Sequence, residues 1–152
     1  MQTSAALPSW QMGRLMFKVM SGLHNALYRA SRGRIAGRVG KLDVLLLTTT
    51  GRKTGKARTV PLLYSNTGGG YAVVASKGGA EQDPAWCVNL RANPHGLADL
   101  GGKRVHVKAR ETEGDERERL WHQMADGYTG YDNYQDKTSR QITVFVLEPT
   151  GP

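Results

Sequence analysis

The chain has 152 residues, enough for one domain around a single hydrophobic core. With 39% hydrophobic and 22% charged residues, it is excluded from the class of disordered chains, and no apolar run reaches the roughly 20 residues that span a bilayer. Its one cysteine, Cys87, excludes an intramolecular disulfide and any zinc site that needs two thiolates.

Positive charge is concentrated in the first half of the chain. The net charge is +8, yet residues 1–80 contain 12 Lys and Arg against one acidic residue, whereas residues 81–152 contain 9 against 12. Such an asymmetric field concentrates an anionic partner on one side of the molecule. That partner is a nucleic acid, an anionic lipid surface or a phosphorylated small molecule, and charge alone does not choose among them.

The first predicted element is a basic amphipathic helix at residues 12–27, because Met and Leu residues recur there at three- and four-residue spacing. It packs on the rest of the protein, or it lies on an anionic membrane with Arg14 and Lys18 facing the headgroups. A glycine- and arginine-rich loop follows. We therefore expect residues 1–40 to form this helix and loop, and residues 41–152 to form the main folded domain. With one thiol and no apolar signal-peptide core, the expected compartment is the cytoplasm, with membrane association as the alternative.

The remaining pattern predicts an α+β fold. Short runs rich in β-branched and apolar residues predict strands at 42–50, 57–65, 71–76, 97–100, 103–111 and 142–148. Asp83 and Pro84 resemble an N-cap and a first-turn proline for a short helix ending at Leu90, and a charged helix is expected at 115–127. Pro61 within the second strand indicates a sheet edge or a bulge. About six strands without a βαβ rhythm favour a mainly antiparallel barrel with flanking helices.

Two basic, glycine-containing segments could bind an anion. The first two strands are joined by GRKTGK, and glycines let backbone N–H groups face an anion while Arg52, Lys53 and Arg58 supply charged donors. The segment is not a nucleotide-triphosphate loop, because it joins two strands instead of opening a helix. Lys77 follows the third strand in SKGG, so its side chain could converge with the hairpin cations on one elongated site.

Three tyrosines spaced by three residues, Tyr128, Tyr131 and Tyr134, line one side of a predicted helical turn. They wall a pocket and present hydroxyl groups to a substrate, or they pack a loop against the barrel. The four histidines show no metal-ligand spacing, so no metal site is expected.

In this order, the stretches LLLTTTGRKTGKARTVPLLY, VVASKGGAEQDPAWCVNLRANP and GYTGYDNYQDKTSRQITVFVLEP resemble the deazaflavin-dependent nitroreductase family over roughly residues 42–149. The resemblance implies a split β-barrel related to flavin-nucleotide oxidoreductases. It also implies coenzyme F420, a deazaflavin whose phospholactyl tail carries several glutamates. The implied activity is hydride transfer from the reduced cofactor to a small electrophile, namely a quinone, an enone or a nitro-aromatic compound.

The resemblance also implies roles for individual residues. The cations would hold phosphate and carboxylates, a second group would lie along the ring system, Trp86 would help close the pocket, and the tyrosines would line the substrate side. Tyr131, Tyr134 or Ser76 could then donate a hydrogen bond or a proton to the acceptor. The implied cofactor-binding residues are Arg52, Lys53, Arg58, Pro61, Ser76, Lys77, Gly78, Gly79 and Trp86; the implied catalytic residues are Tyr128, Tyr131, Tyr134 and Ser76.

Three alternatives stay open at this point. A reductase of the same fold could use FMN, although its single phosphate needs fewer cations than the chain provides. A nucleic-acid binder would use the basic half, but residues 30–60 contain no aromatic side chain for base stacking, so we expect no nucleic-acid partner. A protein that stores the cofactor without turnover is the third alternative.

Overall fold

The computed structural model describes residues 38–39 and 41–151. The predicted amphipathic helix lies outside the described residues, and the division of the chain at residue 40 stays a prediction. Within the predicted loop, strand β1 (Arg38–Val39) pairs antiparallel with the start of β2 (Leu42–Thr50). Residues 38–39 therefore add a short edge strand to the sheet beside β2.

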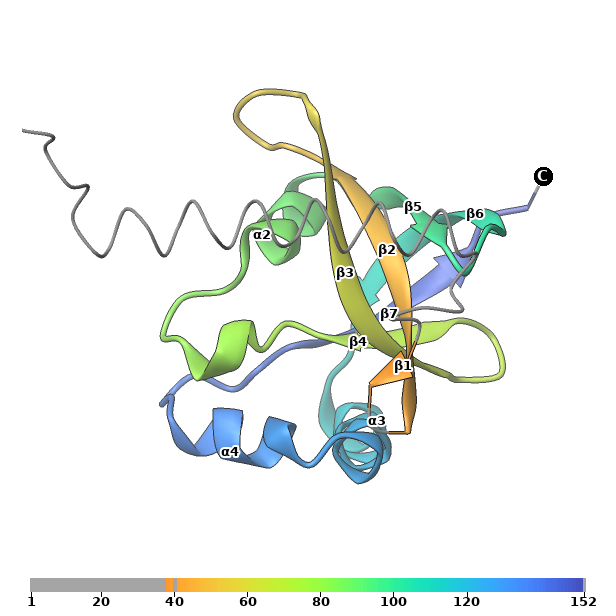
Figure 1. The fold of residues 1–152 in the computed structure, drawn as a ribbon. Coiled ribbons are helices and arrows are strands. Elements are labelled where there is room, and N and C mark those ends of the chain that lie inside the picture. The colour runs from red at the N-terminus through yellow and green to blue at the C-terminus, as the bar shows by residue number, and fades with distance from the viewer. Residues whose placement is uncertain (1–37, 40, 152) are drawn as a thin grey trace, which may run out of the picture.

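Six strands close into an antiparallel barrel (Figure 1). The strand order is β1-β2-β3-β4-β7-β6-β5, and β5 pairs back with β2 to complete the ring. This arrangement confirms the predicted α+β split barrel. The strands that follow β2 are β3 (Ala57–Asn66), β4 (Tyr71–Val74), β5 (His95–Asp99), β6 (Arg104–Glu111) and β7 (Val144–Pro149).

The barrel is split between β3 and β4. The pairing of these two strands is confined to Ser65 and Asn66 of β3, opposite Ala72 and Tyr71. Over the rest of its length β3 pairs with β2, where Pro61 lies opposite Leu46. Because proline has no N–H to donate to a ladder, it is tolerated along this open side of the strand. The edge position predicted for Pro61 is therefore confirmed.

The barrel interior is filled by inward-facing side chains and closed at one end by helix α2 (Ala85–Ala92). Alternate residues such as Leu45 and Leu47 of β2 point inward and meet Trp86 and Leu90 of the helix. The Trp86 ring packs 5.7 Å from that of Phe145 on β7. Full burial of one large apolar side chain stabilises a fold by about 1.5–3 kcal/mol, so this contact anchors α2 firmly on the barrel.

Two further helices cover the outside of the barrel. The helix α3 (Gly114–Gly127) packs Leu120 and Met124 against the outward face of β4 and β7, and α4 (Gly130–Asp136) adds Tyr131 to the same cluster. Among the described residues, no helix is long and apolar enough to cross a membrane.

Two local expectations about the segment between β4 and α2 are wrong. Strand β4 ends at Val74, and Ser76 already has helical backbone angles, φ −77° and ψ −40°. Pro84 rather than Asp83 is the N-cap residue of α2. The Asp83 carboxylate instead accepts hydrogen bonds from Arg91 and Arg140, because charged partners bind a carboxylate more strongly than a backbone N–H does.

Candidate functional site

A hollow of about 1090 Å³ lies between the β2–β3 hairpin, α2 and the segment that follows β4. Small-molecule sites commonly enclose roughly 300–1,000 Å³, so this volume suits a ligand the size of a large cofactor. The residues that line the hollow are Gly51, Arg52, Lys53, Thr54, Ala57, Arg58, Thr59, Val60, Lys77, Glu81, Gln82, Asp83, Ala85, Trp86, Val88 and Asn89.

Four cations from two chain segments face this hollow. Arg52 and Lys53 lie on the hairpin loop, Arg58 near the start of β3, and Lys77 in η1 (Lys77–Gly79), the turn after β4. All four side chains are exposed, so their charges are hydrated and available to a ligand. Because one exposed ion pair contributes only about 0–1 kcal/mol, tight binding here requires a ligand with several negative groups.

Asn89, which sequence reasoning missed, connects the hairpin to α2. Its side-chain Oδ1 accepts a hydrogen bond from the backbone N–H of Arg52 at 3.1 Å, and its Nδ2 donates to the Thr49 hydroxyl at 3.1 Å. The asparagine is only 7% exposed. Its place on the buried side of α2, three residues after Trp86, was an available signal, because buried polar groups nearly always have hydrogen-bond partners.

The turn η1, which follows β4, has an unusual backbone. Lys77, Gly78 and Gly79 have φ angles of +45°, +63° and +84°, all in the left-handed region. A non-glycine residue in this region costs roughly 1–2 kcal/mol, so the conformation of Lys77 must be held by its surroundings. A Cβ on Gly79 would lie 2.6 Å from the backbone oxygen of Tyr134, so glycine lets α4 pack directly on the turn.

The three tyrosines form an aromatic cluster beside that turn. The hydroxyls of Tyr128 and Tyr134 are hydrogen bonded at 2.8 Å, and both rings are half-buried. Tyr131 is only 5% exposed, with its ring 5.1 Å from that of Tyr128 and 6.1 Å from that of Trp121. The hydrogen bond between the Tyr134 and Tyr128 hydroxyls, and then burial, raise the pKa of Tyr134, while burial raises the pKa of Tyr131. The phenols of Tyr131 and Tyr134 therefore stay protonated at neutral pH.

The predicted site residues fall into two neighbouring groups. Arg52, Lys53, Arg58, Lys77 and Trp86 line the hollow together. The remaining candidates do not line it: Pro61 lies further along β3, Ser76 and Gly78 flank Lys77, Gly79 faces α4, and the tyrosines lie on and before α4.

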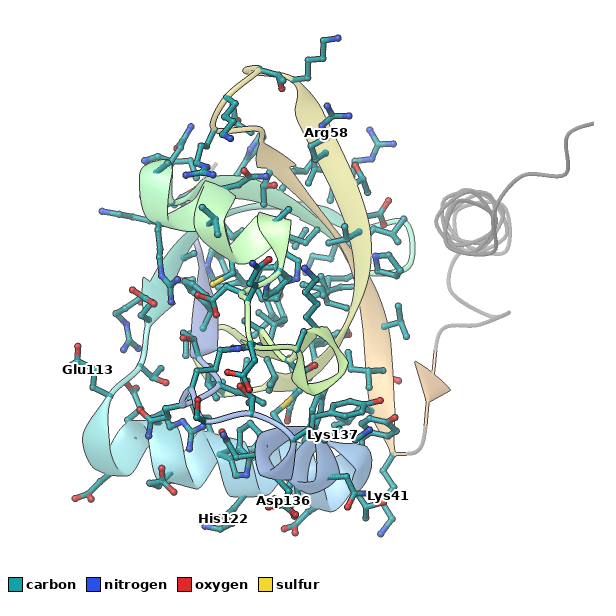
Figure 2. The ribbon with its side chains drawn as sticks, turned by 90° about the vertical axis from the view of Figure 1, so that its left-hand side faces the viewer. Lys41, Arg58, Glu113, His122, Asp136 and Lys137 are labelled. Carbon is teal, nitrogen blue, oxygen red and sulfur yellow. The ribbon has the colours of Figure 1, made fainter. Side chains whose placement is uncertain are left out.

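The two groups lie along one side of the molecule. Figure 2 shows Arg58 on the protruding hairpin and Lys137, just after α4, at the opposite end. Figure 1 shows α2 and the turn η1 between these ends. A ligand that contacts both groups must therefore be long, with its charged part at the hairpin.

These features fit a large polyanionic cofactor. Four exposed cations line the hollow, and Val60, Trp86 and Val88 add apolar surface to it. A split barrel with such a cationic hairpin and an adjoining aromatic cluster is the arrangement that the sequence resemblance implies for a flavin- or deazaflavin-binding oxidoreductase. The hollow thus combines exposed charged groups with apolar surface.

Comparison with known proteins identifies the family. The family model described as F420H(2)-dependent quinone reductase matches residues 20–149. An F420H(2)-dependent quinone reductase of Mycobacterium tuberculosis is 43% identical over 129 residues, which cover 82% of this chain and 87% of that protein. The chain therefore belongs to the F420H(2)-dependent quinone reductase family. The predicted class of F420-dependent oxidoreductase, with F420 as its cofactor, is confirmed.

Solved structures agree with this assignment. The structure of an F420-H2 dependent reductase, FDR-A, has a TM-score of 0.64 and 46% identity, covering 69% of this chain and 93% of that chain. Another, described as a domain-swapped dimer, has a TM-score of 0.67 and 36% identity, covering 93% of this chain and 100% of that chain.

Proposed function

We propose that the chain reduces a quinone with reduced F420, and that the hollow beside the hairpin holds the anionic tail of the cofactor. The observation that carries this proposal is the convergence of Arg52, Lys53, Arg58 and Lys77 on one hollow. A tail with a phosphate and several carboxylates needs separated cations rather than one tight clamp. FMN, with one phosphate, would leave most of these charges without a partner.

The ring system would extend from Trp86 along the η1 turn towards the tyrosines. When bound, the reduced deazaflavin supplies a hydride and is a poor one-electron donor. The residues of the chain would exclude water from the ring, orient the acceptor and stabilise negative charge on its oxygen. Ser76 and the backbone of Gly78 flank Lys77 and would contact the ring, as the resemblance implied.

The half-buried pair of Tyr128 and Tyr134 is better placed to face an acceptor than Tyr131, which is packed in the core cluster. Reduction of a quinone to a quinol requires a proton as well as a hydride. Because the pKa of Tyr134 is raised, its phenol keeps its proton, so the hydroxyl offers a hydrogen bond and does not act as a proton source. We therefore assign the pair to hydrogen bonding of the acceptor oxygen, with the proton coming from water.

Fluorescence titration with oxidised F420, followed by single-turnover reduction of a quinone, tests the proposal. Tyr134→Phe should leave the Kd for F420 within about twofold and slow quinone reduction by on the order of tenfold, the loss of one hydrogen bond to developing charge. Tyr131→Phe is the matched control, since it also removes one hydroxyl. Equal rates for wild type and Tyr134→Phe with several quinones would contradict the assigned role, and tight FMN binding with none of F420 would contradict the whole proposal.

The proposed compartment is the cytoplasm, with no nucleic-acid partner, and with the N-terminal segment in contact with a membrane when the quinone is lipid-soluble. The predicted helix at residues 12–27 lies outside the described residues, so this part is carried by its sequence pattern. Co-sedimentation with anionic liposomes compares the full chain with its Arg14→Glu, Lys18→Glu variant. Equal pelleting of the two proteins would remove the membrane contact.

A further inference from the structure

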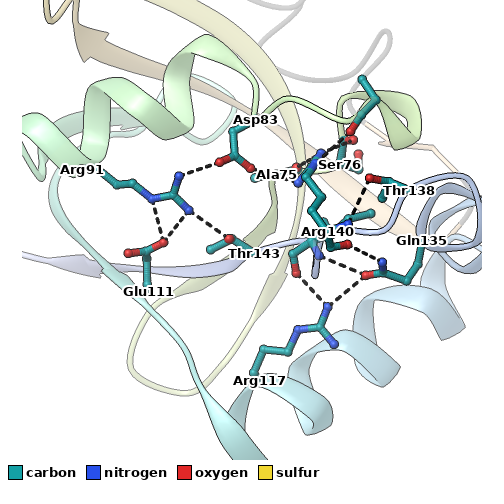
Figure 3. A network of polar contacts seen from close by, with 12 residues as sticks. Ala75, Ser76, Asp83, Arg91, Glu111, Arg117, Gln135, Thr138, Arg140 and Thr143 are labelled. Atoms are coloured by element: carbon teal, nitrogen blue, oxygen red, sulfur yellow. Dashed lines mark hydrogen bonds and ion pairs between the residues drawn. The ribbon is translucent and has the colours of Figure 1, made fainter.

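Arg140 holds the segment that carries Lys77 without lining the hollow itself. Its Nε donates to the backbone oxygen of Ala80 at 2.8 Å, and its Nη2 donates to those of Ala75 and Ser76 at 3.2 and 3.0 Å (Figure 3). Its Nη1 binds the Asp83 carboxylate at 3.0 Å. One guanidinium thus contacts the chain on both sides of the η1 turn.

The turn between these contacts is strained. Lys77 adopts a φ of +45°, which side-chain-bearing residues avoid, and two glycines with positive φ follow it. Conformations of this kind persist only where the surrounding structure holds them. The hydrogen bonds from Arg140 hold both ends of this turn. The Glu81 carboxylate accepts a hydrogen bond from the Ser139 hydroxyl at 3.2 Å, which is a second contact between the segment after β4 and the segment before β7.

The charge of Arg140 is already engaged. Its side chain is 15% exposed and is paired with Asp83, which also binds Arg91 at 2.6 Å. Arg91 in turn pairs with Glu111 at 2.8 Å, so the network alternates positive and negative groups (Figure 3). A neutralised, largely buried guanidinium cannot act as an additional binding site for an anionic tail. Its hydrogen bonds to three backbone carbonyls indicate that Arg140 instead holds the backbone near the site.

We propose that Arg140 is a positioning residue that holds the η1 turn so that Lys77 faces the hollow and its anionic ligand. This inference rests on the proposed role of Lys77 in binding the cofactor tail. Arg140 acts through the turn, because its planar fork bridges carbonyls that a single ammonium could not reach together.

The first test reads the turn directly, without ligand. Hydrogen exchange of the full-length protein is compared for wild type, Arg140→Met and Arg91→Met. Gly79 N–H and Ala80 N–H bond the oxygens of Ser76 and Lys77 at 2.9 and 3.2 Å, so both should be protected in wild type. Arg140→Met should speed their exchange on the order of tenfold or more, leaving the barrel strands unchanged.

Arg91→Met is the matched control for that experiment. It removes a cation bound to the same Asp83 but makes no hydrogen bond to the turn. Exchange in the turn should therefore stay at the wild-type rate. Equal acceleration by both variants, or none by Arg140→Met, would overturn the inference.

The second test is a double-mutant cycle on the Kd for oxidised F420. Arg140→Met should weaken binding by on the order of tenfold alone and by about the same factor in an Arg52→Ala background, but by less than about twofold in a Lys77→Ala background. Arg140→Lys should resemble Arg140→Met, because it keeps the charge and loses the fork.

The outcomes separate the two ideas. If Lys77→Ala binds F420 like wild type, the proposed role of Lys77 fails and the inference falls with it. If Lys77→Ala weakens binding, but Arg140→Met raises the Kd by the same factor in the Lys77→Ala background as in wild type, the role of Lys77 stands. Only the positioning by Arg140 is then overturned. Full rescue by Arg140→Lys would also overturn it, since charge alone would then suffice.

Discussion

Replacing Asn89 by alanine should destabilise the fold and loosen the cationic hairpin at the same time. The change removes two hydrogen bonds, each 3.1 Å long, to the Arg52 backbone and to the Thr49 hydroxyl. A neutral hydrogen bond contributes about 0.5–1.5 kcal/mol to stability, and a buried group left without a partner costs more. Thr49 is 2% exposed, whereas the freed N–H of exposed Arg52 can be hydrated. We therefore expect a loss of about 2 kcal/mol.

Thermal unfolding followed by circular dichroism measures this loss. For a protein of this size, 1 kcal/mol shifts Tm by roughly 2–4 °C, so Tm should fall by roughly 4–8 °C. The F420 titration should show a Kd raised about threefold or more, because the hairpin then spends less time in the conformation that binds.

Asn93→Ala is the matched control, since Asn93 follows the same helix and accepts one exposed hydrogen bond from the His95 N–H at 3.1 Å. Its Tm should fall by less than about 3 °C, with an unchanged Kd. An Asn89→Ala protein with a wild-type Tm would refute the energetic reasoning. A lowered Tm with an unchanged Kd would refute the coupling of Asn89 to the binding of the tail.

Three further changes probe other parts of the site and core. Lys53→Ala should weaken F420 binding up to about fivefold at low salt and have little effect at 1 M salt. Lys56→Ala is the control, because Lys56 lies on the same hairpin but does not line the hollow, and it should change the Kd less. Equal effects of the two changes would contradict a specific contact of Lys53 with the cofactor. Gly79→Ala should cost about 2 kcal/mol or more in urea unfolding, from its positive φ and the close α4 backbone, against about 1 kcal/mol for Gly78→Ala, whose added Cβ meets nothing within 4 Å. Burial raises the pKa of Cys87 to about 12, so between pH 9 and 12 mainly the unfolded thiol ionises and stability falls by up to about 1.4 kcal/mol per pH unit. Cys87→Ala should lack this component, which is about 1 kcal/mol between pH 9 and 10.

The strands could be predicted because their signals are local. The run from Leu42 to Thr50 is bounded by the turn residues of GRKTGK, and β2 spans the predicted range. The predicted strand at 103–111 is likewise observed as β6 (Arg104–Glu111). In each case alternating or continuous apolar residues and flanking glycines agree, so local preference and tertiary packing select the same structure.

The sequence predicted that Lys77 and the hairpin lie on the same side of the sheet, but not that the strands between them leave an open hollow. Antiparallel pairing places the start of β3 beside the end of β4, which brings both cationic segments to the same side of the sheet. The ladder between these strands is confined to Ser65 and Asn66, however, and this short pairing has no signal in the sequence apart from Pro61. The open side leaves room for the hollow, which Arg58 and Lys77 line from opposite segments.

The residues that hold the site in place could not be predicted, because their partners are distant in the chain. Asn89 binds groups 37 and 40 residues away, and Arg140 binds carbonyls 60 to 65 residues away. The N-cap predicted at Asp83 was wrong for the same reason, because its carboxylate accepts a hydrogen bond from Arg140, 57 residues further along the chain. Side-chain ties of this kind depend on which loops the fold brings together, and no short pattern encodes them.

The position of the site follows from unequal strand lengths around the barrel. Strands β2 and β3 have 9 and 10 residues, whereas β4 and β7 have 4 and 6. Strand β2 pairs with β5 only from Leu46 to Thr48, so the hairpin beyond Thr48 projects past the barrel (Figure 1). At about 3.3 Å per residue this projection is long enough to present a row of cations beside α2. Because β2 and β3 pair with each other up to Thr50 and Ala57, the projection is a rigid ladder, and Asn89 then needs only two hydrogen bonds to orient it.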